Sequence, residues 1–194
     1  MSGRATSHDD ILQIGDPRLR EAARAVEDLA DPAVRADGEK VHGALMSFRE
    51  RWGFGRGTAA TQLGIPRRII ALHMPDWPDL IFNPEYAWKS PETFTLWENC
   101  MSFPFMLVRT RRHRSVSLRY LDAAGREHVR EDVEIELAEL LQHEIDHLDG
   151  TLAVDRAIDG DAIVARKTFD ADREHFLAQV DYRANNDKIP ANRS

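Results

Sequence analysis

Cysteine is almost absent from this chain of 194 residues, which contains Cys100 alone. A single thiol excludes an internal disulfide framework, so Cys100 is an inert core residue, a nucleophile or a metal ligand. Long apolar runs are also absent: none approaches the roughly 18 residues of a membrane span. The first ten residues, MSGRATSHDD, lack the apolar core of a signal peptide. We therefore expect a cytoplasmic protein that does not associate with membranes.

An excess of positive charge is missing as well. The 26 Lys and Arg residues against 33 Asp and Glu residues give a net charge of −7, so we expect no stable nucleic-acid binding. A composition of 42% hydrophobic and 30% charged residues is ordinary for a globular protein, and no internal repeat is present. We expect a monomer with one domain over residues 1–184 and a disordered tail over 185–194.

The stretch Leu137–Gly150, LAELLQHEIDHLDG, combines helical periodicity with a metal-binding motif. Its leucine and isoleucine residues recur at helical spacing, and Gly150 stands where a helix would end. His143 and His147 are four residues apart, so they lie one turn apart on one helix face and can bind the same metal ion. Glu144 points into the apolar face, where burial should raise the pKa of its carboxyl group. The sequence therefore predicts an active site on this helix.

Periodicity elsewhere indicates a mixture of helices and strands. We expect an extended piece and a short helix over 11–30, a longer helix over 34–52, strands over 68–73, 79–88, 93–97, 115–122 and 128–134, and a last amphipathic helix over 165–180. Four glycines in residues 53–64 (GFGRGTAATQLG) form either a loop that lets the backbone approach a ligand or a simple turn. A phosphate-binding loop is disfavoured because no Gly-Lys-Ser/Thr follows.

A basic cluster precedes the strand predicted over 115–122, and its arginines stand at positions 109, 111, 112 and 114. Such a run usually forms a solvated face. Two alternatives are an ion pair between Arg112 and Asp146 and contact with a polyanion, such as the ribosome.

A third metal ligand is needed, because a catalytic zinc-type site has three protein ligands and one open position for water. In metzincin proteases the third ligand is a histidine three residues after the glycine, but Ala153 occupies that position here. A thermolysin-like protease would use a downstream glutamate, and Glu174 is the only one available. Cys100, which precedes the helix, is the more economical third ligand.

Three segments, in this order, resemble the motifs of the peptide deformylase family. That family shows G-x-G-L-A-A-x-Q, E-G-C-L-S and Q-H-E-x-D-H-L-x-G, and here the segments read GRGTAATQ (55–62), ENCMS (98–102) and QHEIDHLDG (142–150). The resemblance extends to DPRLREAARAV (16–26) and to Asp155 and Arg156. It implies an α+β fold in which antiparallel strands surround a central metal-binding helix.

The resemblance also implies an activity. A deformylase is a metal-dependent amide hydrolase that removes the N-formyl group from N-formylmethionyl peptides or nascent chains, releases formate and serves N-terminal processing in protein biosynthesis. One divalent ion, Fe²⁺ in the cell and often Zn²⁺ or Ni²⁺ in purified protein, would be held by Cys100, His143 and His147.

The implied catalytic residues are Glu144, Gln62 and Met101. The cation would acidify a water molecule. Glu144 would take a proton from this water and pass the proton to the leaving amine. The Gln62 amide and the backbone N–H of Met101 stabilise the oxyanion. The implied substrate-binding residues are Gly55, Arg56, Gly57, Asn99, Glu136, Glu139 and Leu140.

Charged residues stand where the family has apolar ones. The position of Glu136 is usually apolar and helps form the pocket for the methionine side chain, and the position of Arg56 usually holds valine or isoleucine. Burying these charges without partners costs several kcal/mol. Either the enzyme acts on a small, more polar N-formyl amine, or the two side chains pair or turn to solvent and leave ordinary specificity. A zinc metalloprotease and a metal-binding protein without catalysis are further alternatives.

Overall fold

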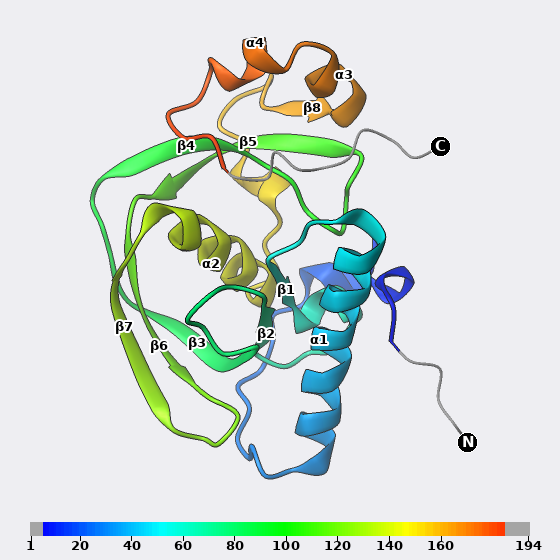
Figure 1. Cartoon of the computed structure of the whole chain (residues 1–194), viewed down its shortest axis with the longest axis vertical. Coiled ribbons are helices and arrows are strands. Elements are labelled where there is room, and N and C mark those ends of the chain that lie inside the picture. Colours follow the sequence, from blue (N-terminus) through cyan, green and yellow to red (C-terminus); the bar gives the residue numbers. More distant parts are fainter. Residues whose placement is uncertain (1–5, 185–194) are drawn as a thin grey trace.

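The computed structural model describes residues 6–184 and places two antiparallel sheets around one helix, α2 (Ile135–Leu148), as Figure 1 shows. The five-stranded sheet has the order β1 (Gly57–Ala59), β2 (Ile69–Leu72), β3 (Leu80–Lys89), β6 (Val116–Leu121) and β7 (Glu127–Val133). The three-stranded sheet has the order β4 (Thr93–Glu98), β5 (Met106–His113) and β8 (Ile163–Ala165). All strand pairs are antiparallel, so the expected α+β architecture is confirmed.

Helix α1 (Pro32–Trp52) covers the β1–β2 end of the larger sheet (Figure 1). The Asp31 side chain accepts a hydrogen bond from the Ala33 N–H and so satisfies one free amide at the helix N-terminus. Val41 and Leu45 are fully buried on the side that faces β2, where they pack with Ile69. The predicted helix over 34–52 is therefore confirmed, with its N-terminus two residues earlier.

Helix α2 is buried on all sides over residues 138–148. Leu141, Ile145 and Leu148 pack against the inner face of the larger sheet, where Leu118 and Tyr120 lie. A helix with no solvent-exposed face lies at the centre of a fold rather than on its surface. The smaller sheet closes the other side of α2 (Figure 1). None of the helices between residues 6 and 184 is long and apolar enough to cross a membrane.

The five predicted strands correspond to β2, β3, β4, β6 and β7, whereas β1, β5 and β8 were not predicted. The single helix predicted over 165–180 is wrong: the chain forms two short helices, α3 (Arg166–Ala171) and α4 (Arg173–Leu177), with a break at Asp172. The break lets Phe169 and Phe176 stack at 5.3 Å and both contact Trp97. In one continuous helix these two rings would be about 10 Å apart along the axis. The predicted tail over 185–194 lies outside the described residues.

Gly150 ends α2 with a left-handed φ of +71°, and a Cβ atom there would lie 2.5 Å from the backbone oxygen of Arg20. We expect Gly150→Ala to lower the free energy of unfolding by about 2 kcal/mol or more, because both the backbone and the packing oppose the methyl group. Gly160→Ala is the matched control, since nothing lies within 4 Å of its added Cβ. Urea unfolding followed by circular dichroism measures both. Equal stability of the two variants would show that the structure at position 150 does not require glycine.

Candidate metal centre

Three potential metal ligands meet in the interior between α2 and the end of β4. Cys100 follows β4, and His143 and His147 lie on α2. The Cys100 Sγ lies 3.2 Å from His147 Nε2, which in turn lies 3.2 Å from His143 Nε2. The three ligand atoms are all within 4.8 Å of one another, and all three residues are buried. Atoms bound to one tetrahedral ion are about 3.3–3.8 Å apart, so the arrangement fits a metal centre.

Glu98, the last residue of β4, fixes the orientation of His143. Its Oε2 lies 2.8 Å from His143 Nδ1, and its Oε1 accepts hydrogen bonds from Arg112 Nε and Thr110 Oγ1, both at 2.6 Å. Burial alone would raise the pKa of Glu98, but the charge of Arg112 outweighs it and holds that pKa far below its ordinary value. An ionised Glu98 accepts a hydrogen bond from the Nδ1–H of His143 and leaves the lone pair of its Nε2 free for a metal ion.

Glu98 was part of a quoted motif but was not predicted as a site residue. The available signal was a carboxylate two residues before the candidate ligand Cys100. Carboxylates that orient a ligating histidine are common in metal sites, but only the fold shows which histidine is in reach.

Arg112 on β5 is buried, with only 4% of its side chain exposed, and bridges Glu98 to Asp146 on α2. Arg156 also donates to Asp146, at 2.8 Å. The predicted ion pair between Arg112 and Asp146 is therefore confirmed, and a solvated face is wrong for Arg112. Alternation along the strand separates it from Arg111, which is exposed.

Glu144 is buried beside the ligand cluster and has a free oxygen. Among the described residues, no group hydrogen-bonds to its Oε2. Burial raises the pKa of Glu144 to about 7, although the charges of His143 and Arg56 oppose the shift. A Cβ atom on Gly57 would come within 3.0 Å of Glu144 Oε1, so the glycine gives the carboxylate its room. The group is poised to exchange a proton near neutral pH.

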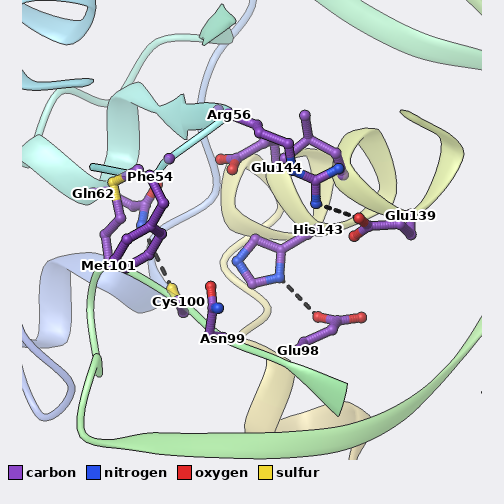
Figure 2. A pocket seen from close by; sticks show the side chains of 13 residues that line it. Phe54, Arg56, Gln62, Glu98, Asn99, Cys100, Met101, Glu139, His143 and Glu144 are labelled. Atoms are coloured by element: carbon purple, nitrogen blue, oxygen red, sulfur yellow. Dashed lines mark hydrogen bonds and ion pairs between the residues drawn. The ribbon is translucent and has the colours of Figure 1, made fainter. Parts of the chain in front are cut away.

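The Gln62 amide is oriented toward the same cluster. Its Oε1 accepts a hydrogen bond from the Ala59 N–H at 3.0 Å, which turns Nε2 toward Ser102 Oγ at 3.2 Å and Cys100 Sγ at 3.6 Å. Figure 2 shows this amide beside Cys100. A fixed N–H donor next to a metal site is suited to bind a developing negative oxygen.

A pocket opens onto these groups, and Figure 2 shows its walls. It is lined by Phe54, Gly55, Arg56, Gly57, Gln62, Glu98, Asn99, Cys100, Met101, Glu139, Leu140, His143 and Glu144. These include every predicted substrate-binding residue except Glu136. Glu136 is half-buried outside the lining, and its backbone carbonyl accepts a hydrogen bond from Arg56 Nη1 at 2.9 Å. Phe54 was not predicted as a pocket residue, and the sequence gives no indication of this role except its position in the glycine-rich stretch.

The charged residues at the pocket wall pair with each other. The Arg56 guanidinium forms an ion pair with Glu139 (Figure 2), and the two side chains are 16% and 5% exposed. Burial raises the pKa of Glu139, and Arg56 offsets part of that shift. The pair therefore satisfies two charges that would otherwise be buried alone.

Sequence comparison matches residues 8–162 to the family described as polypeptide deformylase. A peptide deformylase from Thermotoga neapolitana is 35% identical over 157 residues, which cover 81% of this chain and 92% of that protein. One from Brachyspira hyodysenteriae is 32% identical over 155 residues, which cover 76% of this chain and 79% of that protein. The chain belongs to the peptide deformylase family.

Solved structures of peptide deformylases share the fold. The crystal structure of the enzyme from Thermotoga maritima matches with a TM-score of 0.68 at 32% identity and covers 77% of this chain and 97% of that one. The deformylase from Plasmodium falciparum in complex with an inhibitor matches with a TM-score of 0.67 at 26% identity, over 87% of this chain and 99% of that one.

As a peptide deformylase, the protein is a metal-dependent hydrolase that removes the N-formyl group from nascent peptides. The comparisons do not favour the alternative of a small polar N-formyl amine, nor that of a zinc metalloprotease. The charge of Arg56, which had suggested a different substrate, is neutralised by the ion pair with Glu139.

The ion pair predicts a specific pattern of stabilities in this deformylase. Arg56→Met should lower the free energy of unfolding by about 3 kcal/mol, because it leaves the Glu139 carboxylate buried without its partner. The double variant Arg56→Met/Glu139→Met should lie within about 1 kcal/mol of the wild type. Chemical denaturation of the wild type, Arg56→Met, Glu139→Met and the double variant measures this. A double variant as unstable as the sum of both single changes would show that the two side chains act independently.

Proposed function

We propose that Cys100, His143 and His147 hold the deformylase's divalent cation and that Glu144 is its general acid and base. When bound, the cation supplies a Lewis acid that polarises the formyl carbonyl and acidifies a water molecule. Three buried donor atoms within 4.8 Å of one another support the ligand set. The observation that carries the role of Glu144 is its buried Oε2, which has no partner among the described residues.

Glu144 takes a proton from the attacking water and returns it to the departing amine. A pKa raised to about 7 suits both halves of this cycle, since the group can be charged when it accepts and neutral when it donates. The wall that Gly57 leaves open lets the carboxylate reach into the pocket. Burial excludes bulk water, which would otherwise compete for the proton.

Gln62 and Met101 stabilise the oxyanion, and the remaining pocket residues hold the substrate. The fixed Nε2 of Gln62 donates a side-chain hydrogen bond, and the backbone N–H of Met101 donates a second one. The backbone of Gly55, Arg56 and Gly57 contacts the peptide along one wall of the pocket. On the other walls the contacts come from Asn99, Glu139 and Leu140, and Glu136 acts through its carbonyl, which holds Arg56 in place.

In the cell, the proposed function also involves a location, a particular cation and nascent chains. The protein acts in the cytoplasm as a monomer formed by one domain over residues 1–184, and Fe²⁺ is its cation there. Its substrates are nascent chains, and the exposed side chains of Arg111 and Arg114 are the members of the basic cluster available to meet a ribosome.

Glu144→Gln should reduce formate release from formyl-Met-Ala-Ser by at least about 100-fold, because the amide keeps the shape of the side chain but accepts no proton. Metal content, measured by elemental analysis, should be unchanged. Glu131→Gln, which alters an exposed glutamate on β7, is the matched control and should keep full activity. Activity of Glu144→Gln above about a tenth of wild type would remove Glu144 from the mechanism.

Removal of the cation by a chelator should abolish formate release and lower the melting temperature, because a ligand that binds only the folded state stabilises it. Anaerobic addition of Fe²⁺ should restore more activity than addition of Zn²⁺. His147→Ala should lose the metal and show no change in melting temperature on chelation. Retention of one equivalent of metal by His147→Ala would contradict the proposed ligand set.

A further inference from the structure

A second cavity lies next to the active-site pocket, and Asn99 lines both. It is enclosed by β4 and β5 on one side and by the C-terminal helices α3 and α4 and residues 182–184 on the other, at the top of Figure 1. Most of its lining residues lie between 166 and 184, after the last residue that the family match covers. Most of the cavity wall therefore lies outside the segment that the family match covers.

The cavity is positively charged and partly aromatic. Arg166, Arg173 and Arg183 line it, and among the described lining residues Asp170 is the only acidic one. Arg183 is engaged with Glu174 at 3.5 Å, and the Arg173 guanidinium lies 5.9 Å from the centre of the Phe169 ring.

Arg166 forms no ion pair with a described carboxylate, although the charge of Asp170 acts on it from a longer distance. It is half-buried, and its Nε donates to the Pro104 carbonyl at 2.6 Å. Within residues 6–184, no carboxylate lies in ion-pair distance of its guanidinium, and burial lowers the pKa of this group. A half-buried guanidinium with unused donors binds a carboxylate well, because its planar fork matches both oxygens.

The C-terminal segment ties this cavity to the active site. The Asp181 carboxylate accepts hydrogen bonds from the backbone N–H and the Oγ1 of Thr95, at 2.9 and 2.8 Å. The Tyr182 N–H donates to the Thr95 carbonyl at 3.0 Å, and the Tyr182 ring packs edge-on against Phe94. Tyr182 lines the second cavity. Burial raises the pKa of its phenol, and in the first pocket the charge of Glu139 adds to this shift while that of Arg56 opposes it. The two cavities are thus neighbours along β4.

We propose that the second cavity is a subsite for an acidic side chain that follows the formylated residue of the substrate, with Arg166 as its charged group. This inference rests on the proposed function, since the substrate is a formyl peptide held in the first pocket. The net charge of −7 repels acidic peptides in general, so a preference for them needs a local cationic site such as this one. Asn99 lines both cavities, so a substrate peptide bound in the first pocket would extend past this residue to reach the second cavity.

The test compares amidated peptides that differ only in one side chain. They are formyl-Met-Glu-Ser and formyl-Met-Ala-Glu amides, each paired with its glutamine counterpart. With metal-loaded enzyme, kcat/KM should be about fivefold higher for glutamate than for glutamine in at least one of the two pairs. Added salt should reduce that ratio. A ratio of one or less in both pairs would overturn the proposal.

Two variants assign the preference to the cavity. Arg166→Gln should bring the glutamate-to-glutamine ratio to one or below, and Arg166→Lys should keep part of it because the charge remains without the fork. Lys167→Gln removes the same charge from an exposed neighbouring position on α3 and should keep the wild-type ratio. A ratio that survives Arg166→Gln in a folded protein would also overturn the proposal.

Failure of the subsite and failure of the catalytic proposal are distinguishable. Activity on the glutamine peptides tests catalysis alone, whereas the ratio tests the subsite. Calorimetric titration of the Glu144→Gln protein with the same peptides gives their Kd values without turnover. Tighter binding of the glutamate peptide, lost on adding Arg166→Gln, supports the subsite whatever the rate of formate release. Equal Kd values would count against it.

Discussion

The buried charge network of Glu98, Arg112 and Asp146 is the constraint on which the site depends. It joins three elements, the consecutive strands β4 and β5 and the later helix α2. Buried charges are costly unless each has a partner, so none of the three elements can shift without exposing an uncompensated charge. Because Glu98 also holds His143, and Cys100 follows two residues later, the network sets the distance between the thiol and the imidazoles.

The burial of α2 makes the same centre chemically useful. A helix surrounded by both sheets keeps water from its side chains, and this is why the pKa of Glu144 rises to about 7. The neighbouring Glu98 is equally buried but has the opposite shift, because Arg112 lies against it. Two carboxylates close to the proposed metal ligands thus differ in role: Glu98 is held in its ionised form and orients His143, whereas Glu144 can exchange a proton.

Local sequence patterns predicted the elements whose formation depends on neighbouring residues along the chain. The helix that carries His143 and His147 and five of the strands follow from periodicity, and the motif supplies the proposed ligand set. For Arg112 the sequence offered the ion pair with Asp146 only as an alternative to a solvated face, because its partners Glu98 and Asp146 are 14 and 34 residues away and only the fold brings them within reach. The pairing of Arg56 with Glu139, 83 residues apart, and the break between α3 and α4 around Trp97 likewise depend on tertiary contacts.

The C-terminal elements differ from the rest of the fold in how they are attached. They pack on β4 and β5 through Trp97 and Phe169 and through the bonds from Asp181 to Thr95, and none of these contacts involves the metal ligands or the buried charge network. Side chains alternate along β4, so Glu98 faces α2 while its neighbour Trp97 faces α3 and α4. Adjacent residues of β4 therefore contact different parts of the fold, so the C-terminal elements can vary in sequence without disturbing the buried charge network.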